Sequence, residues 1–297
     1  MALVLPTDAS ATQPKQPVTD LDQAAFFKPE LYISSSHAAL ADIQSRLPNR
    51  EAWDTFLQAR AAGGGDAVHV YIDPRSGAAT NIVGAFPIIP GSGAGNTVTL
   101  STVSRSLGRS VRGIDAETVA ALVRRFVVAH QDVLAIDVRQ LGTFTATQVN
   151  PDLWQVSAPQ QVNGVPVRHG RLAATISHGN LVVIGTETWG NAAVDIGPAV
   201  AAEFALDAGF AQAGGRALAD VLLQEPALEV IPVAPLGRQQ GDLYVGEVGA
   251  GYEHRLVWSF VFQRPPEHAR WEVMVDAHTG DVLSLQDINH YVQRRVT

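Results

Sequence analysis

The chain contains no cysteine among its 297 residues. This absence excludes disulfide bonds, thiolate chemistry and the zinc motifs that use cysteine ligands. It leaves the redox compartment open, because a protein without cysteine is stable in either setting. The chain also has no run of the roughly 18 to 20 apolar residues that span a bilayer. The sequence therefore predicts neither a disulfide scaffold nor a membrane span.

Positive charge is scarce as well. Lysine and arginine together number 21 against 29 aspartates and glutamates, which gives a formal net charge of -8. A protein that binds nucleic acid needs a basic stripe to neutralise phosphates, and this sequence has none. We therefore expect no nucleic-acid partner. A chain of this length can form two or three modules of ordinary domain size.

The signatures of common hydrolytic sites are also missing. There is no His-Glu-x-x-His, the helical pattern that binds zinc and activates water, and Glu253-His254 and Glu267-His268 have the reversed order. There is no Gly-x-Ser-x-Gly nucleophile elbow. Asp276 and Asp281 flank a predicted turn, where carboxylates commonly cap the backbone. We expect no catalytic residue, no metal site and no cofactor, with each histidine at the surface or in a structural hydrogen bond.

Two glycine-rich segments superficially resemble phosphate-binding loops. The segment at residues 91–96 lacks the lysine and the following helix of a P-loop, and its spacing is not that of a dinucleotide fingerprint. The segment at residues 246–251 runs directly into a strand-like sequence. Both are interpreted as solvated loops.

The start of the chain predicts a flexible lead-in over residues 1–22, because this stretch has no apolar periodicity. Its first apolar run is too short for a signal peptide and has no basic start. Either export is absent or the signal has been removed. We favour removal and expect a secreted or periplasmic protein.

An α+β module is predicted over residues 23–112. Apolar residues share a helical face over residues 34–47 and again over residues 51–62, and a glycine triplet ends the second helix. Residues 68–72 and 79–86 then predict two strands around an Asp-Pro-x-x-Gly turn.

The clearest helix begins after Asp115, a suitable N-cap, and keeps apolar residues at three- and four-residue steps as far as His130. Antiparallel strands and a further helix follow, and the Asn163-Gly164 pair predicts a tight hairpin turn. The sequence thus predicts an α+β fold of antiparallel sheets with helices packed on one face. The expected strands cover residues 143–149, 154–161, 170–177 and 181–187, and the helix covers residues 197–213.

The last part of the chain predicts a hairpin. In residues 256–262 the aromatic side chains alternate with valine and serine, and in residues 270–276 Trp271, Val273 and Val275 alternate with Glu272, Met274 and Asp276. Each run therefore predicts a strand with one apolar face. The turn that follows spans Asp276 to Gly280, where Asp and Thr side chains can bond the backbone and glycine can adopt a positive φ.

These segments carry a resemblance to a known family. Residues 256–260 and the run from Trp271 to Leu283 resemble the end of a PepSY domain in propeptides of secreted zinc metallopeptidases. The run from Gln160 to Leu172 resembles the fungalysin/thermolysin propeptide domain, whose pattern is Q-x-V-x-G-V-P-V-x-x-G-x-L. The first motif is carried by Asn163, Gly164, Pro166 and Gly170, and the second by Trp258, Trp271, Asp276, Thr279 and Gly280.

The resemblance implies two domains, a fungalysin/thermolysin propeptide-like domain over residues 113–190 and a PepSY or cystatin-like module over residues 191–297. It implies a non-catalytic zymogen propeptide that assists folding of a secreted zinc metallopeptidase and inhibits its catalytic domain until cleavage. The motif residues would have architectural roles. The alternative is a free-standing secreted binding or inhibitor protein of the PepSY type, and a surface-anchored structural module is a third interpretation.

The tail over residues 287–297 is the expected junction with the peptidase. Thermolysin-like enzymes cut before large or branched apolar residues, so the resemblance makes Tyr291, Val292 and Val296 candidates for self-cleavage. Arg294-Arg295 would instead suit a separate trypsin-like activator. The alternative is a solvated tail or an edge strand that covers the sheet.

Overall fold

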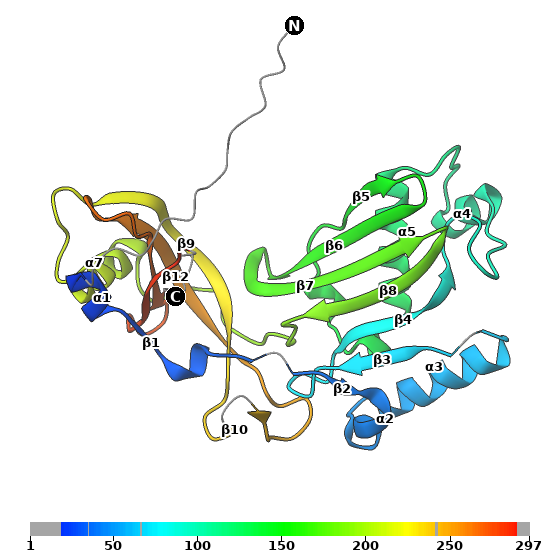
Figure 1. Cartoon of the computed structure of the whole chain (residues 1–297), viewed down its shortest axis with the longest axis horizontal. Coiled ribbons are helices and arrows are strands. Elements are labelled where there is room, and N and C mark those ends of the chain that lie inside the picture. The colour runs from blue at the N-terminus through cyan, green and yellow to red at the C-terminus, as the bar shows by residue number, and fades with distance from the viewer. Residues whose placement is uncertain (1–18, 35, 66, 241–242, 290–297) are drawn as a thin grey trace, which may run out of the picture. The chain divides into compact units, whose positions relative to one another are not determined.

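The computed structural model of the chain describes residues 19–34, 36–65, 67–240 and 243–289. They form the α+β fold that the sequence predicts, with largely antiparallel sheets and short helices (Figure 1). The chain divides into two compact units. Unit 1 contains residues 1–28, 198–228 and 257–297, and unit 2 contains residues 29–197 and 229–256. No helix in the described ranges is long and apolar enough to cross a bilayer.

Unit 2 is built on an antiparallel sheet with the strand order β5-β6-β7-β8-β4-β3-β2. Two of its hairpins have two-residue turns, Asn163-Gly164 and His178-Gly179, in which all four φ angles are positive, as type I′ turns require. The strands are β2 (Ala38–Ala39), β3 (His69–Ile72), β4 (Ala79–Pro87), β5 (Thr145–Asn150), β6 (Leu153–Val162), β7 (Val165–Ser177) and β8 (Asn180–Glu187).

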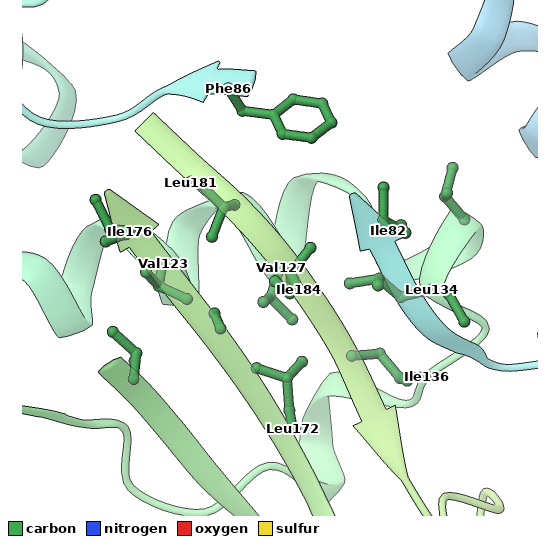
Figure 2. Packing of buried hydrophobic residues seen from close by; sticks show 14 of the residues in the cluster. Ile82, Phe86, Val123, Val127, Leu134, Ile136, Leu172, Ile176, Leu181 and Ile184 are labelled. Carbon is green, nitrogen blue, oxygen red and sulfur yellow. The ribbon is translucent and has the colours of Figure 1, made fainter. Parts of the chain in front are cut away.

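Helix α5 (Ala116–Ala129) packs against one face of this sheet. Its Val123 and Val127 meet Leu172, Ile176 and Ile184 of β7 and β8 in the core (Figure 2). Asp115 caps the helix as predicted, because its carboxylate accepts from the N–H of Thr118 at 2.8 Å. The unit also contains α3 (Arg50–Ala62), α4 (Leu100–Leu107), α6 (Gln131–Leu134), and the 3-10 turns η1 (Pro29–Leu31) and η3 (Val138–Gln140).

The prediction of one continuous helix over residues 34–47 is wrong. Strand β2 pairs with β3 there, followed by a four-residue helix α2 (Leu40–Ile43) and a 3-10 turn η2 (Gln44–Arg46). Leu40, Ile43 and Leu47 are nevertheless buried in the core, so the apolar spacing identified the correct side chains. Helix α4 was not predicted, although Thr99 gives it a capping box with Thr102. The segment at residues 91–96 contains no helix or strand, as expected of a loop.

Unit 1 has the strand order β1-β14-β13-β12-β9. Helix α7 (Ala202–Gln212) packs on β13 and β14 and starts five residues later than predicted. The residues before the helix make a tertiary contact, since the N–H groups of Ala199 and Val200 both donate to the carbonyl of Ala277. The strands are β1 (Phe26–Phe27), β9 (Val221–Val233), β12 (Glu253–Gln263), β13 (Trp271–Asp276) and β14 (Val282–Asp287).

The core of unit 1 is aromatic. Phe210 of α7 lies 4.9 Å from Phe262 and 5.7 Å from Phe260 between ring centroids. Leu21 belongs to the same cluster and is 1% exposed. It lies in α1 (Asp20–Ala24), which overlaps the end of the predicted lead-in; residues 1–18 lie outside the described residues.

Strands β9 and β12 belong to both units, because residues 229–233 and 253–256 fall in unit 2. Between them lies a small hairpin of β10 (Gln239–Gln240) and β11 (Leu243–Tyr244), followed by the loop predicted at residues 246–251. The domain boundaries at residues 22, 112 and 190 stay predictions.

Candidate functional site

The turn at the end of β13 is organised by the side chain of Asp276. Its Oδ1 accepts from the N–H groups of His278 at 2.9 Å and Thr279 at 3.0 Å. The hydroxyl of Thr279 then accepts from the N–H of Asp281 at 3.2 Å. The carboxylate is thus occupied by backbone groups, in an arrangement typical of an Asx turn.

Gly280 has a double reason to be glycine. Its φ is +81°, a conformation that costs other residues energy. A Cβ at this position would also lie 2.6 Å from Cε1 of Phe204 on α7. The turn therefore contacts helix α7 as well as joining strands β13 and β14.

The two tryptophans of the second motif also have structural partners. Trp271 is 1% exposed, and its Nε1 donates to Oε2 of Glu267 at 3.3 Å. Trp258 donates from Nε1 to the carbonyl of Val200 at 3.0 Å, just before α7. All five residues of the second motif therefore lie in unit 1 and position α7 against the hairpin or close its turn.

The residues of the first motif lie together in unit 2, at the β6–β7 hairpin. Asn163 and Gly164 form its turn, and Pro166 is the register partner of Gln161. Gly170 lies against Gln160, so close that a Cβ would stand 2.3 Å from Oε1 of the glutamine.

Gln160 is the motif residue whose role sequence reasoning missed. It is fully buried and donates from Nε2 to Oε1 of Gln140 at 2.9 Å and to the carbonyl of Gly190 at 2.7 Å. Gln140 in turn bonds both the N–H and the carbonyl of Ala192. Buried amides of this kind specify one packing arrangement because each unpaired group would be costly. The glutamine at the first position of the motif was the feature of the sequence that could have indicated this role.

Within residues 19–34, 36–65, 67–240 and 243–289, no group of three His, Cys, Asp or Glu side chains is placed to hold a metal ion. Burial lowers the pKa of His254 to about 4 and also lowers that of His130. His130 stacks near Phe126, with centroids 4.5 Å apart. The Nε2 of His254 and that of His278 are buried without a hydrogen-bond partner in the described part of the chain.

Strand β9 presents an open edge in unit 1. One edge of β9 faces β12, and the described residues supply only one pairing on the other edge, between Val167 and Val230. Residues 221–228 have no described strand there. Val221 is 49% exposed and Leu223 is 44% exposed, while Pro226, which has no N–H to donate, is a residue that edge strands tolerate.

The candidate processing residues Tyr291, Val292, Arg294, Arg295 and Val296 lie outside the described residues. The final strand β14 ends at Asp287, the first residue of the expected tail.

Comparison with known proteins gives a match for part of the chain. Residues 202–285 match the family described as "Peptidase propeptide and YPEB domain", or PepSY. Among solved structures, the chain is similar to the Bacillus megaterium YpeB C-terminal domain at 10% identity and a TM-score of 0.30, over 87% of this chain and 100% of that one. No curated protein matches the sequence. The match confirms the PepSY resemblance of the second motif; the fungalysin/thermolysin resemblance of the first stays a prediction.

Proposed function

We propose that the chain is the non-catalytic propeptide of a secreted, thermolysin- or fungalysin-like zinc metallopeptidase. In this role it assists folding of the catalytic domain and inhibits it until cleavage. The observation that carries the proposal is the PepSY match over residues 202–285, a family described by its occurrence in peptidase propeptides.

The arrangement of the motif residues supports a surface-based mechanism. Oδ1 of Asp276 and the indole N–H groups of the two tryptophans are engaged in structural contacts within unit 1, which favours an architectural role for these residues. Inhibition would therefore come from a contact surface that blocks the peptidase cleft.

The open edge of β9 is the surface that we assign to this contact. Peptidase clefts bind substrates as extended strands, and an extended segment can add to an exposed sheet edge through main-chain hydrogen bonds. Val221 and Leu223 would supply apolar contacts beside those bonds. The tail over residues 287–297 is the proposed junction, cut before Tyr291, Val292 or Val296, or after the Arg294-Arg295 pair.

The proposal predicts that the chain raises the refolding yield of a peptidase domain encoded beyond Thr297 and inhibits it when added in excess. Activity is measured against a peptide substrate, and the chain alone, with zinc, should give no turnover. Mass spectrometry of the matured peptidase should place its first residue within or just after residues 287–297. Equal refolding and unchanged activity without the chain would reject the proposal, as would turnover by the chain itself.

A paired set of variants tests the β9 edge. The double variant Val221→Lys, Leu223→Lys adds two charges to the edge and should weaken inhibition by about tenfold or more, since like charges and lost apolar contact both oppose strand addition. Val149→Lys is the matched control, because Val149 is 54% exposed on strand β5 of unit 2. If the double variant and the control inhibit equally well, the contact with the peptidase does not use the β9 edge, although the chain could still be a propeptide.

A further inference from the structure

Unit 2 contains a polar cavity that the proposed function does not use. It has a volume of about 420 Å³ and lies on the sheet face opposite α5. Ala173 and Thr175 of β7 line it, and Leu172 and Ile176 on the other face of the strand belong to the core.

The wall of the cavity carries hydroxyl and carboxyl groups. The residues that supply them include Ser34, Thr80, Asp73 and Tyr252, and His37 lines the cavity as well. Among the residues that the structure describes, the acidic lining residues are Asp73 and Glu187, and no lysine or arginine is part of the lining. A volume of this size, with several convergent polar groups, is typical of a site for a small ligand or a single side chain.

Asp73 is the exceptional group in this wall. It is only 7% exposed. Its Oδ2 accepts from the hydroxyl of Tyr252 at 2.7 Å, and its Oδ1 accepts from the main-chain N–H of Arg75 at 2.9 Å. Each oxygen of a carboxylate can accept more than one hydrogen bond, so both retain capacity.

The nearby guanidinium of Arg75 does not compensate this charge fully. Arg75 is fully buried, donates from Nη2 to the hydroxyl of Ser34 at 3.1 Å, and lies over the ring of Tyr244 at 5.2 Å. Burial still raises the pKa of Asp73 above its ordinary value, although the Tyr252 hydrogen bond and the Arg75 charge act in the opposite direction. A buried carboxylate whose charge is only partly compensated is stabilised when a cation binds beside it.

Glu187 differs from Asp73 because it already has a cationic partner. Its Oε2 lies 2.7 Å from Nε of Arg171, and both side chains are 56% exposed. Such an exposed pair contributes little to binding a further charge.

We propose that this cavity binds one ammonium or guanidinium group, with Asp73 as its counter-ion and the surrounding hydroxyls as hydrogen-bond partners. The cation is carried either by a small free amine or by a lysine or arginine side chain of a peptide. The inference is independent of the β9 edge and of any peptidase partner.

Isothermal titration calorimetry tests the proposal with agmatine, which carries a guanidinium and an ammonium, and with (4-hydroxybutyl)urea, a urea analogue in which both charged groups are replaced by uncharged groups of similar size. Agmatine should bind with one-to-one stoichiometry, and the urea analogue at least about tenfold more weakly. The peptide Ac-Gly-Arg-Gly-NH₂ identifies the source: tighter binding than agmatine indicates a peptide side chain, and weaker binding a free amine. Equal binding of the urea analogue, or no saturable binding of either cation below about 10 mM, would overturn the proposal.

Asp73→Asn should reduce agmatine binding by about tenfold or more, while its amide oxygen can still accept from Arg75. Asp42→Asn makes the same charge change at an exposed position of unit 2 outside the cavity and should leave binding unchanged. Thr175→Arg is a second variant that does not touch the turn at Asp73; at a half-buried lining position it places a guanidinium in the cavity and should abolish binding. Undiminished binding by either Asp73→Asn or Thr175→Arg contradicts the assignment.

Discussion

At the scale of single residues, the motif positions act through contacts that a substitution can disturb one at a time. Gly170 is the clearest example, because the absence of a side chain leaves space for the amide of Gln160. That amide donates hydrogen bonds to Gln140 and to the carbonyl of Gly190. A larger residue would displace a buried polar group from its partners, and that costs more than the lost contact itself.

Gly170→Ala should lower the free energy of unfolding by about 1 to 3 kcal/mol, the range for overpacking a well-packed core. Gly113→Ala is the control, since a Cβ there meets no atom within 4 Å. It should change stability by less than about 0.5 kcal/mol. Urea denaturation of both variants measures the difference, and equal stabilities would show that Gln160 moves aside freely.

His254 predicts a pH dependence. Burial lowers its folded-state pKa from the ordinary 6.5 to about 4, so the fold favours the neutral ring. The contribution to stability is complete above pH 6.5 and is lost as the pH falls from there toward 4.

Between pH 8 and pH 5 the chain should therefore lose about 2 kcal/mol more stability than His254→Phe, which keeps a ring but cannot titrate. The Nε2 of His254 has no described hydrogen-bond partner, so the phenylalanine loses no such bond. Chemical denaturation at the two pH values gives the comparison. Parallel pH profiles for the two proteins would contradict the burial of a neutral ring.

At the scale of elements, the first helix and strand complete unit 1. Strand β1 pairs with the outer edge of β14, with Phe26 opposite Leu285, and α1 brings Leu21 into the aromatic core. Thr19 starts this helix with a capping box, in which its hydroxyl accepts from the N–H of Asp22.

Leu21→Ala should destabilise unit 1 by about 2 to 5 kcal/mol, as expected when a buried leucine leaves a cavity. Leu218→Ala is the control, because Leu218 is fully exposed in the same unit. Denaturation followed by tryptophan fluorescence is suitable, since Trp271 lies in the affected cluster. Similar stability of both variants would mean that α1 contributes nothing to the core.

At the scale of the whole molecule, the chain order and the spatial units differ. Unit 1 combines the start of the chain with two later segments, and unit 2 takes in residues 229–256 from within the range that matches PepSY. A PepSY segment cut out at its sequence limits would lack Leu21 and β1. This arrangement is the reason that experiments on this protein should use the full chain.

The sequence by itself determined the elements whose signals are local. Asp115 caps α5, Asn163-Gly164 turns between β6 and β7, and the apolar runs identify β12 and β13 as strands, because these signals depend on neighbouring residues. The single apolar face predicted for β12 is wrong, since Val257 and Val261 are buried as well as Phe260 and Phe262. The PepSY resemblance was likewise present in the order of residues around Trp258 and Gly280, and the match over residues 202–285 confirms it.

Tertiary structure decided the rest. Residues 38–39 became a strand because β3 offered a free edge, and Gln160 acquired its role from partners 20 and 30 positions away along the chain. The Asp73 cavity depends on Tyr252, 179 residues later. These contacts form only when segments far apart in the sequence meet in the fold, and the local propensity of either segment does not predict its partner.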